Sequence, residues 1–132
     1  MSGNKVVLDT NVIIFASKQK IDIERLLSIY DEVYISIISF MEVYGYNFSE
    51  ESEKGLIDEM FNNLDIVEVH AAIAEQVIEY RKNTLRKIKL PDAIILATAK
   101  SLGADLITDD WDDFQGIDKT VQVKKIDEFK RS

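Results

Sequence analysis

The chain has 132 residues with no cysteine, one proline and a single histidine, and 24 acidic residues outnumber 16 basic ones, for a net charge of −8. This length and composition are typical of one compact domain with its own hydrophobic core. The absence of cysteine excludes disulfide scaffolds, thiolate zinc sites and cysteine nucleophiles, and the lone His70 excludes any site that needs two imidazoles. The acidic balance argues against a protein that binds polyanions through its overall charge.

The chain also lacks the signals of a membrane or secreted protein. Its longest apolar runs, 12–16 and 94–97, are much shorter than the roughly 20 residues that a membrane span requires. The first five residues are polar, and no apolar signal-peptide segment follows them. We therefore expect a cytoplasmic protein with no membrane partner.

Short β-branched runs alternate with stretches of helical periodicity along the chain. Strands are predicted at 5–8, 33–37, 66–69, 105–108 and 121–123. Helical spacing of apolar residues predicts helices around 26–30 and 50–64, and another from about 73 to about 87. Pro91 begins a last, very apolar helix, which Gly103 ends. This alternation predicts an α/β domain with a central, largely parallel sheet of about five strands, in which ligands bind beyond the carboxyl ends of the strands.

Three acidic residues lie where ligands are expected, either after a predicted strand or near the start of a predicted helix. Asp9 ends the first strand between two apolar runs, where a carboxylate must be solvated, paired, bound to a cation, or used to cap the next helix. Glu42 lies one turn into a helix after the second strand and has apolar neighbours on nearly every side, although most helix glutamates simply face solvent. Asp92 lies in the first turn of the apolar helix, where the helix dipole also favours an acid.

Besides these three single residues, an acidic segment follows the strand at 105–108. It contains Asp109, Asp110, Asp112 and Asp113 within five residues. Such a segment is often only a solvated turn, but a divalent cation would relieve the repulsion between its charges. Oxygen ligands from separate elements favour Mg²⁺ or Mn²⁺, and the composition argues against zinc. The sequence leaves open whether Asp109, Asp110 or Asp113 is the fourth ligand.

In this order, Asp9-Thr10-Asn11, Glu42, Pro91-Asp92-Ala93 and Thr108 with Asp110 resemble the motifs of the PIN domain family, most of all the small VapC-type toxins. The resemblance covers residues 1–132 as a single PIN domain and implies a three-layer α/β/α fold with the activity of an endoribonuclease that depends on Mg²⁺ or Mn²⁺. It implies catalytic and metal-binding roles for Asp9, Glu42, Asp92 and Asp110, with Asp109 as an alternate ligand. It also implies supporting hydrogen-bond roles for Thr10, Asn11 and Thr108.

A cationic strip at 81–89 precedes Asp92 and contains five bases and no acid. We expect it to guide RNA phosphates to the site, although such bases are also favoured at the solvated end of a helix. Its members are Arg81, Lys82, Arg86, Lys87 and Lys89. A hydroxide generated by the metal would attack the phosphodiester in line, so this chemistry needs no part from His70, which we interpret as structural or exposed.

The resemblance also implies protein partners. VapC-type toxins usually form homodimers and are inhibited by a small VapB-type antitoxin, and we expect both here. Two other functions stay open: a stand-alone PIN nuclease in RNA processing, and a non-catalytic acidic module for protein interactions. A receiver domain or a haloacid-dehalogenase phosphatase is disfavoured, because each needs a further acid near Asp9 where Thr10 and Asn11 stand.

Overall fold

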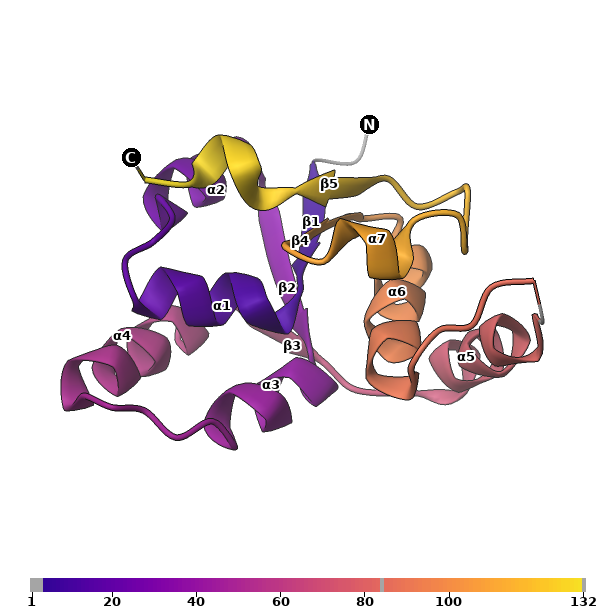
Figure 1. The fold of residues 1–132 in the computed structure, drawn as a ribbon, viewed down its shortest axis with the longest axis horizontal. Helices are drawn as coiled ribbons and strands as arrows, with labels where there is room; N and C mark the ends of the chain where they lie inside the picture. Colours follow the sequence, from indigo (N-terminus) through magenta and orange to yellow (C-terminus); the bar gives the residue numbers. More distant parts are fainter. Residues whose placement is uncertain (1–3, 84, 132) are drawn as a thin grey trace.

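The structure is a computed structural model that describes residues 4–83 and 85–131. Strands and helices alternate along the chain (Figure 1). In order they are β1 (Lys5–Leu8), α1 (Thr10–Ser17), α2 (Ile23–Ile29), β2 (Glu32–Ser36), α3 (Ile37–Tyr44), α4 (Glu51–Phe61), β3 (Asp65–Val67), α5 (Ala71–Lys82), α6 (Leu90–Leu102), β4 (Asp105–Thr108), α7 (Trp111–Phe114), β5 (Val123–Lys125) and a 3₁₀ turn (Ile126–Phe129).

The five strands form one parallel sheet in the order β3-β2-β1-β4-β5. Helices α1, α2 and α4 cover one face, and α5, α6 and α7 cover the other, which makes three layers (Figure 1). The predicted α/β/α fold with a parallel sheet of about five strands is therefore confirmed. Because β1 is central and parallel strands are joined by crossovers, the carboxyl ends of β1, β2 and β4 lie at one edge of the sheet.

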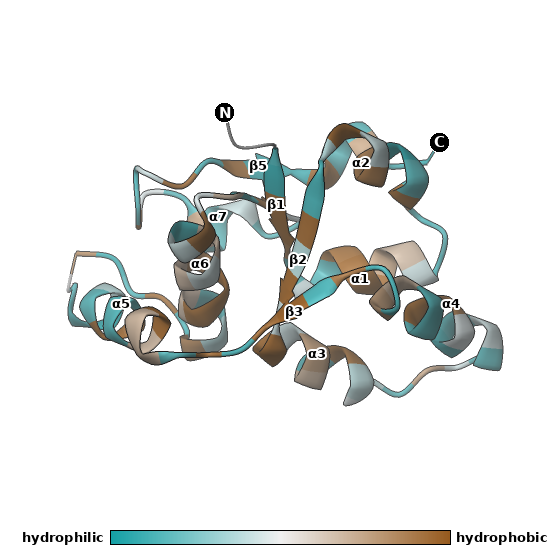
Figure 2. Ribbon diagram, turned by 180° about the vertical axis from the view of Figure 1, so that it is seen from behind, coloured by the Kyte–Doolittle hydropathy of each residue, from teal (hydrophilic) through white to brown (hydrophobic). Residues whose placement is uncertain are grey.

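Burial on both faces explains why β1 is almost entirely apolar. Val6 and Leu8 belong to the core beneath α1 and α4, whereas Val7 belongs to the core beneath α5 and α6. Side chains alternate between the faces of a strand, so each face of β1 must be apolar. Figure 2 shows brown, hydrophobic stretches in the central strands β1 and β2 and many teal, hydrophilic residues on α4 and α5.

Helix α6 begins and ends where the sequence predicts. Pro91 lies in its first turn, where a missing amide hydrogen costs little, and Gly103 follows its last residue with a positive φ of 64°. The buried residues of α6, among them Ala93 and Leu96, attach it firmly to the sheet. The N-terminus of this helix is therefore held in a defined position at the carboxyl edge of the sheet.

Several predicted boundaries are wrong: α4 ends at Phe61 and not at 64, and β3 ends at Val67 and not at 69. Two more lie at the end of α5 and the start of β5. Helix α5 ends at Lys82 and not near 87, because Asn83 adopts an extended ψ of 113° and its side chain accepts a hydrogen bond from the Leu85 amide. Strand β5 begins two residues later than predicted, at Val123, since its pairing with β4 places Lys125 opposite Thr108. Among the helices of the described residues, none has the length and hydropathy to span a membrane.

Candidate active site

A pocket of about 270 Å³ opens at the carboxyl edge of the sheet. All four acids predicted for the site line it, although they come from the end of β1, from α3, from the start of α6 and from the segment after β4. The lining residues are Asp9, Thr10, Asn11, Glu42, Lys89, Pro91, Asp92, Asp110 and Asp113. The parallel sheet brings these segments together because each follows a strand, or begins a helix, at the same edge.

Asp9 is the most buried of these acids, with 5% of its surface exposed. Its backbone amide continues the pairing of β1 with β4 by donating to the Ile107 carbonyl at 3.0 Å. One carboxylate oxygen accepts from the Thr10 amide at 2.8 Å and caps α1, and the other accepts from the Thr108 hydroxyl at 2.7 Å. Burial nevertheless raises the pKa of Asp9 to about 6, and the charges of Asp92 and Asp110 add to this increase.

Glu42 is held by a short chain of hydroxyl groups. The Thr10 hydroxyl donates to Glu42 Oε1 at 2.6 Å, and its oxygen lies 2.9 Å from that of Ser39. Because a hydroxyl has a single proton, Thr10 can donate to Glu42 only while Ser39 donates to Thr10. Ser39 is completely buried and lies one turn before Glu42 on α3. Ser39 is not among the predicted site residues, although its spacing of three residues from Glu42 places both on one face of a helix.

Asp92 lies in the first turn of α6 and is partly buried. Its pKa is raised to about 6, first by burial and then by the negative charges of Asp113 and Glu42, while Lys89 opposes the shift. The acids line one pocket, so their negative charges repel one another and add to the effect of burial on these pKa values. A site that must bind a cation needs this concentration of negative charge.

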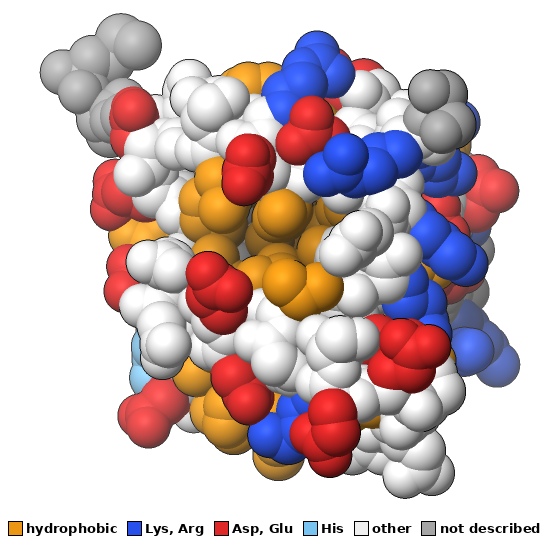
Figure 3. All heavy atoms as spheres, turned by 90° about the vertical axis from the view of Figure 1, so that its left-hand side faces the viewer, with side chains coloured by type: hydrophobic (Ala, Val, Ile, Leu, Met, Phe, Trp, Pro, Cys, Tyr) orange, Lys and Arg blue, Asp and Glu red, His pale blue; other side chains and the backbone are white. Residues whose placement is uncertain are grey.

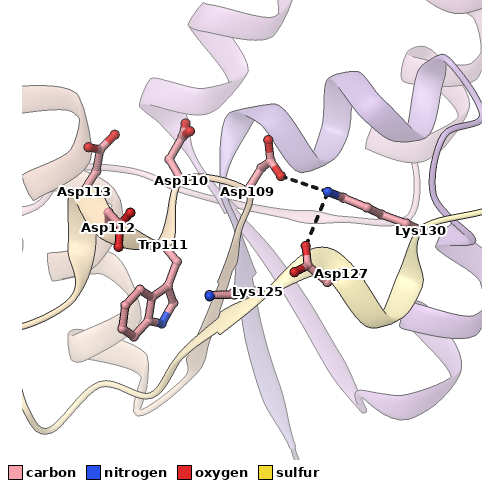
Figure 4. Close-up of a pocket in the computed structure, with 8 residues that line it drawn as sticks. All are labelled: Asp109, Asp110, Trp111, Asp112, Asp113, Lys125, Asp127 and Lys130. Atoms are coloured by element: carbon pink, nitrogen blue, oxygen red, sulfur yellow. Dashed lines mark ion pairs between the residues drawn. The ribbon is translucent and has the colours of Figure 1, made fainter.

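The acidic side chains of the segment after β4 point in different directions. Asp110 accepts a hydrogen bond from the Asn11 side-chain amide at 2.8 Å, and its own amide donates to the Thr108 hydroxyl at 2.9 Å. Asp109 instead points toward Lys130, at 3.6 Å (Figure 4). Asp113 contributes a fifth carboxylate to the pocket. Asp110 therefore belongs to the same pocket as Asp9, whereas Asp109 lines two neighbouring hollows.

The donor set of the pocket is entirely oxygen-based, with five carboxylates beside hydroxyl and amide groups. This chemistry fits a hard divalent cation such as Mg²⁺ or Mn²⁺. In residues 4–83 and 85–131, no three acidic or histidine side chains are already arranged to hold one ion. The carboxylates line a common pocket, but they do not surround one point at which an ion would sit. Glu42 instead accepts a hydrogen bond from Thr10, and Asp110 accepts one from Asn11.

The bases of the predicted cationic strip reach different places. Lys89 precedes α6 and is the one base among the lining residues of the pocket. Arg81 and Lys82 end α5 and are exposed, and Lys87 is exposed in the connection to α6. Arg86 is partly buried, and its Nε atom has no hydrogen-bond partner among the described residues. His70 is exposed at the start of α5 and does not line the pocket.

Comparisons with known proteins agree with this fold. A toxin–antitoxin complex from Klebsiella pneumoniae contains a chain that is 32% identical, with coverage of 88% of this chain and 94% of that one and a TM-score of 0.73. VapBC-1 from nontypeable Haemophilus influenzae is 26% identical, with coverage of 93% and 98% and a TM-score of 0.73. VapBC2 from Rickettsia felis, bound to a promoter DNA fragment, is 22% identical, with coverage of 92% and 98% and a TM-score of 0.77.

Among curated protein sequences, none matches this chain significantly. The PIN domain family matches residues 6–120, which include every acid of the pocket. The chain therefore belongs to the PIN domain family, within which it resembles the VapC-type toxins of toxin–antitoxin systems.

Proposed function

We propose that this protein is the toxin of a toxin–antitoxin pair and hydrolyses RNA phosphodiester bonds as an endoribonuclease dependent on Mg²⁺ or Mn²⁺. The observation that supports this function best is the meeting of Asp9, Glu42, Asp92 and Asp110 in one pocket of a PIN fold. An RNA substrate would place this activity in the cytoplasm.

In this proposal each residue has a defined part. Asp9 and Asp92 would hold the ion, because Asp9 is buried and hydrogen-bonded and Asp92 lies in the first turn of the well-packed helix α6. Glu42 and Asp110 would complete the ligand set, with Thr10 and Asn11 to orient them. Lys89 would contact the scissile phosphate. When bound, the ion supplies the acidity that activates an attacking water and the charge that stabilises the transition state.

Replacement of Asp92 by asparagine tests this function. We expect Asp92→Asn to lower Mn²⁺-dependent cleavage of total RNA by roughly 100-fold or more, because a ligand charge is lost while the side-chain shape is kept. Asp65→Asn, which changes an exposed acid of β3 outside the pocket, is the control and should cleave as the wild type does. Equal cleavage by wild type and Asp92→Asn would show that a contaminant cuts the RNA.

An apolar hollow supports the proposed antitoxin partner. It lies on the face formed by α1, α2 and α4 and has a volume of about 260 Å³ (Figure 3). Ala16, Ile23, Leu27, Leu56, Met60 and Leu64 line it, with Glu24, Glu59 and Asn63. An exposed apolar hollow with acidic side chains at its rim suits an apolar segment flanked by basic residues. We propose that a VapB-type antitoxin supplies this segment.

We also propose a homodimer. Large apolar side chains are exposed at Met41 on α3 and Leu90 on α6, with 55% and 51% of their surfaces accessible. Each is the chain neighbour of a residue that lines the pocket, Glu42 and Pro91 respectively. Apolar exposure of this kind favours association, and the mass in solution by light scattering tests it.

A further inference from the structure

Two further hollows lead away from the candidate active site. The first, of about 450 Å³, shares Asp110 and Asp113 with the acidic pocket (Figure 4). The second, of about 480 Å³, shares Asp109 and Lys130 with the first. Because each hollow shares lining residues with the next, the three lie in series across the surface. We call the two outer hollows the flanking path.

The first hollow contains the single tryptophan of the chain. Trp111 begins α7, and its indole Nε1 donates to the Val123 carbonyl at 3.1 Å. This hydrogen bond fixes the ring as part of the wall, and the Lys125 ammonium lies 5.0 Å from the ring centre. The ammonium lies over the ring, so nucleotide binding would move Lys125 from the ring to a phosphate and let a base stack in its place.

Five aspartates and two lysines line the first hollow, and the charge of four of these aspartates, all but Asp112, is partly offset. Lys130 forms ion pairs with Asp109 at 3.6 Å and with Asp127 at 3.3 Å, so its single positive charge offsets half of their combined charge (Figure 4). Asp110 and Asp113 also line the acidic pocket, where the proposed ion would offset their charge. Unlike the acidic pocket, the flanking path therefore offers an anionic ligand an aromatic surface together with the Lys125 ammonium.

The second hollow is basic. Lys20, Lys130 and Arg131 line it together with one acid, Asp109. Lys20 and Arg131 are exposed, and the Lys20 ammonium lies 5.7 Å from the centre of the Phe15 ring. The lining thus changes from acidic at the catalytic pocket to basic at the far end of the flanking path. An RNA backbone that leaves the pocket would be attracted in this direction.

We propose that the flanking path binds the nucleotides on one side of the scissile phosphate of single-stranded RNA, with a base stacked on Trp111 and phosphates near Lys125, Lys20 and Arg131. Single-stranded RNA is specified because a base must be unpaired to stack on a protein side chain. This inference rests on the proposed nuclease function, and it assigns specificity to residues outside the acidic pocket. Trp111 would select for an unpaired nucleotide at one fixed distance from the cut.

Cleavage of RNA oligonucleotides of increasing length tests the flanking path. Each substrate contains one cleavage site and is extended by one nucleotide at a time, on either its 5′ or its 3′ side. For wild type with Mn²⁺, we expect extension on one side to raise kcat/KM by roughly tenfold when the stacked position is filled. In Trp111→Ala this gain should disappear, while the shortest substrate is still cleaved at the wild-type rate. Trp111→Phe, which keeps an aromatic ring, should retain most of the gain.

The charge of the path is tested with a matched pair of lysines. Lys20→Gln should reduce the gain from the longer extensions and weaken its dependence on salt. Lys54→Gln is the control, because Lys54 is also exposed and also lies near an aromatic ring, at 5.9 Å from the Tyr44 centre, but lines neither outer hollow.

The outcomes separate the two proposals. If wild type cleaves none of the oligonucleotides, the proposed nuclease function is wrong. If wild type cleaves them and Trp111→Ala keeps the full gain from extension, the nuclease function stands and the flanking path is overturned. If Trp111→Ala keeps this gain but weakens binding of the antitoxin, the surface belongs to a protein partner, and the RNA assignment is also overturned.

Discussion

Ser39 illustrates how a buried hydroxyl can control a carboxylate without being near the reacting atoms. It lies 2.9 Å from the Thr10 hydroxyl oxygen, and Thr10 donates to Glu42 at 2.6 Å. If Ser39 is lost, Thr10 keeps its proton but loses the donor that satisfies its own oxygen. Glu42 is then less strictly oriented toward the pocket. Ser39 is a positioning residue in this arrangement.

We therefore predict that Ser39→Ala weakens Mn²⁺ binding by roughly tenfold, as other substitutions behind metal ligands do. Isothermal titration calorimetry measures this affinity. Ser39→Thr, which restores the hydroxyl, should bind Mn²⁺ nearly as wild type does. Ser17→Ala is the control, since Ser17 is also buried but its hydroxyl donates to the Ile14 carbonyl on α1. If both alanine variants weaken Mn²⁺ binding equally, the effect comes from lower protein stability and not from a change in the orientation of Glu42.

The raised pKa values of Asp9 and Asp92 predict how stability depends on pH. Both values are about 6, above the usual 3.8. Between pH 4 and pH 6 the folded state retains these protons after the unfolded state has lost them, so the contribution of these two acids to stability falls as pH rises. At pH 7 without metal, Asp92→Asn should be more stable than wild type by about 1–2 kcal/mol. At pH 4 the difference should vanish.

Urea unfolding of both proteins at the two pH values, with EDTA present, measures this effect. Glu75→Gln, which changes an exposed acid of α5, should follow the wild type at both. A variant Asp92→Asn that is less stable than wild type at pH 7 would contradict the raised pKa of Asp92.

At the scale of secondary structure, helix ends and strand pairing determine where the residues of the site lie. Helix α6 presents Asp92 because Pro91 begins the helix and Gly103 ends it, and both signals are local to the sequence. The end of α5 is also local, but its signal is weaker, since Asn83 stops the helix through its own side chain while apolar periodicity continues. The start of β5 depends on its register with β4 and has no local signal.

Substitution by alanine should have opposite effects on stability at two glycines, one within α4 and one directly after α6. Gly103 has a φ of +64°, so Gly103→Ala should lower the free energy of unfolding by about 1 kcal/mol. Gly55 lies within α4, and an added methyl group would meet nothing within 4 Å, so Gly55→Ala should raise it by about 0.5–1 kcal/mol. Urea unfolding of the two variants against wild type measures both changes. Stabilisation by both would show that Gly103 does not need its left-handed conformation.

At the scale of the whole molecule, the two proposed functions, RNA cleavage and antitoxin binding, use separate surfaces. The acidic pocket lies at the carboxyl edge of the sheet, and the apolar hollow lies over α1, α2 and α4 (Figure 3). The two share no lining residue. Antitoxin binding and RNA cleavage should therefore be separable by substitution.

Met60 in the apolar hollow provides the test. Met60→Glu places a charge among apolar side chains and adds to the acids at the rim, so we predict that it abolishes co-purification with the cognate antitoxin. RNA cleavage by the free toxin should be unchanged. Ser52→Glu, at an exposed position of the same helix that does not line the hollow, should still co-purify. A Met60→Glu protein that binds antitoxin normally would show that the antitoxin docks elsewhere.

The sequence by itself determined the strands, the parallel sheet, the apolar helix that begins at Pro91 and the four candidate acids, three of them at the ends of these elements and Glu42 within a helix. Those features follow from periodicity and from residue types that act over a few neighbours. Only the tertiary structure decided that Asp110 and not Asp109 shares the pocket, that Ser39 supports Thr10, and that Trp111 lines a path from the site. Each depends on how one strand pairs with another, and therefore on residues far apart in the chain, which local patterns do not record.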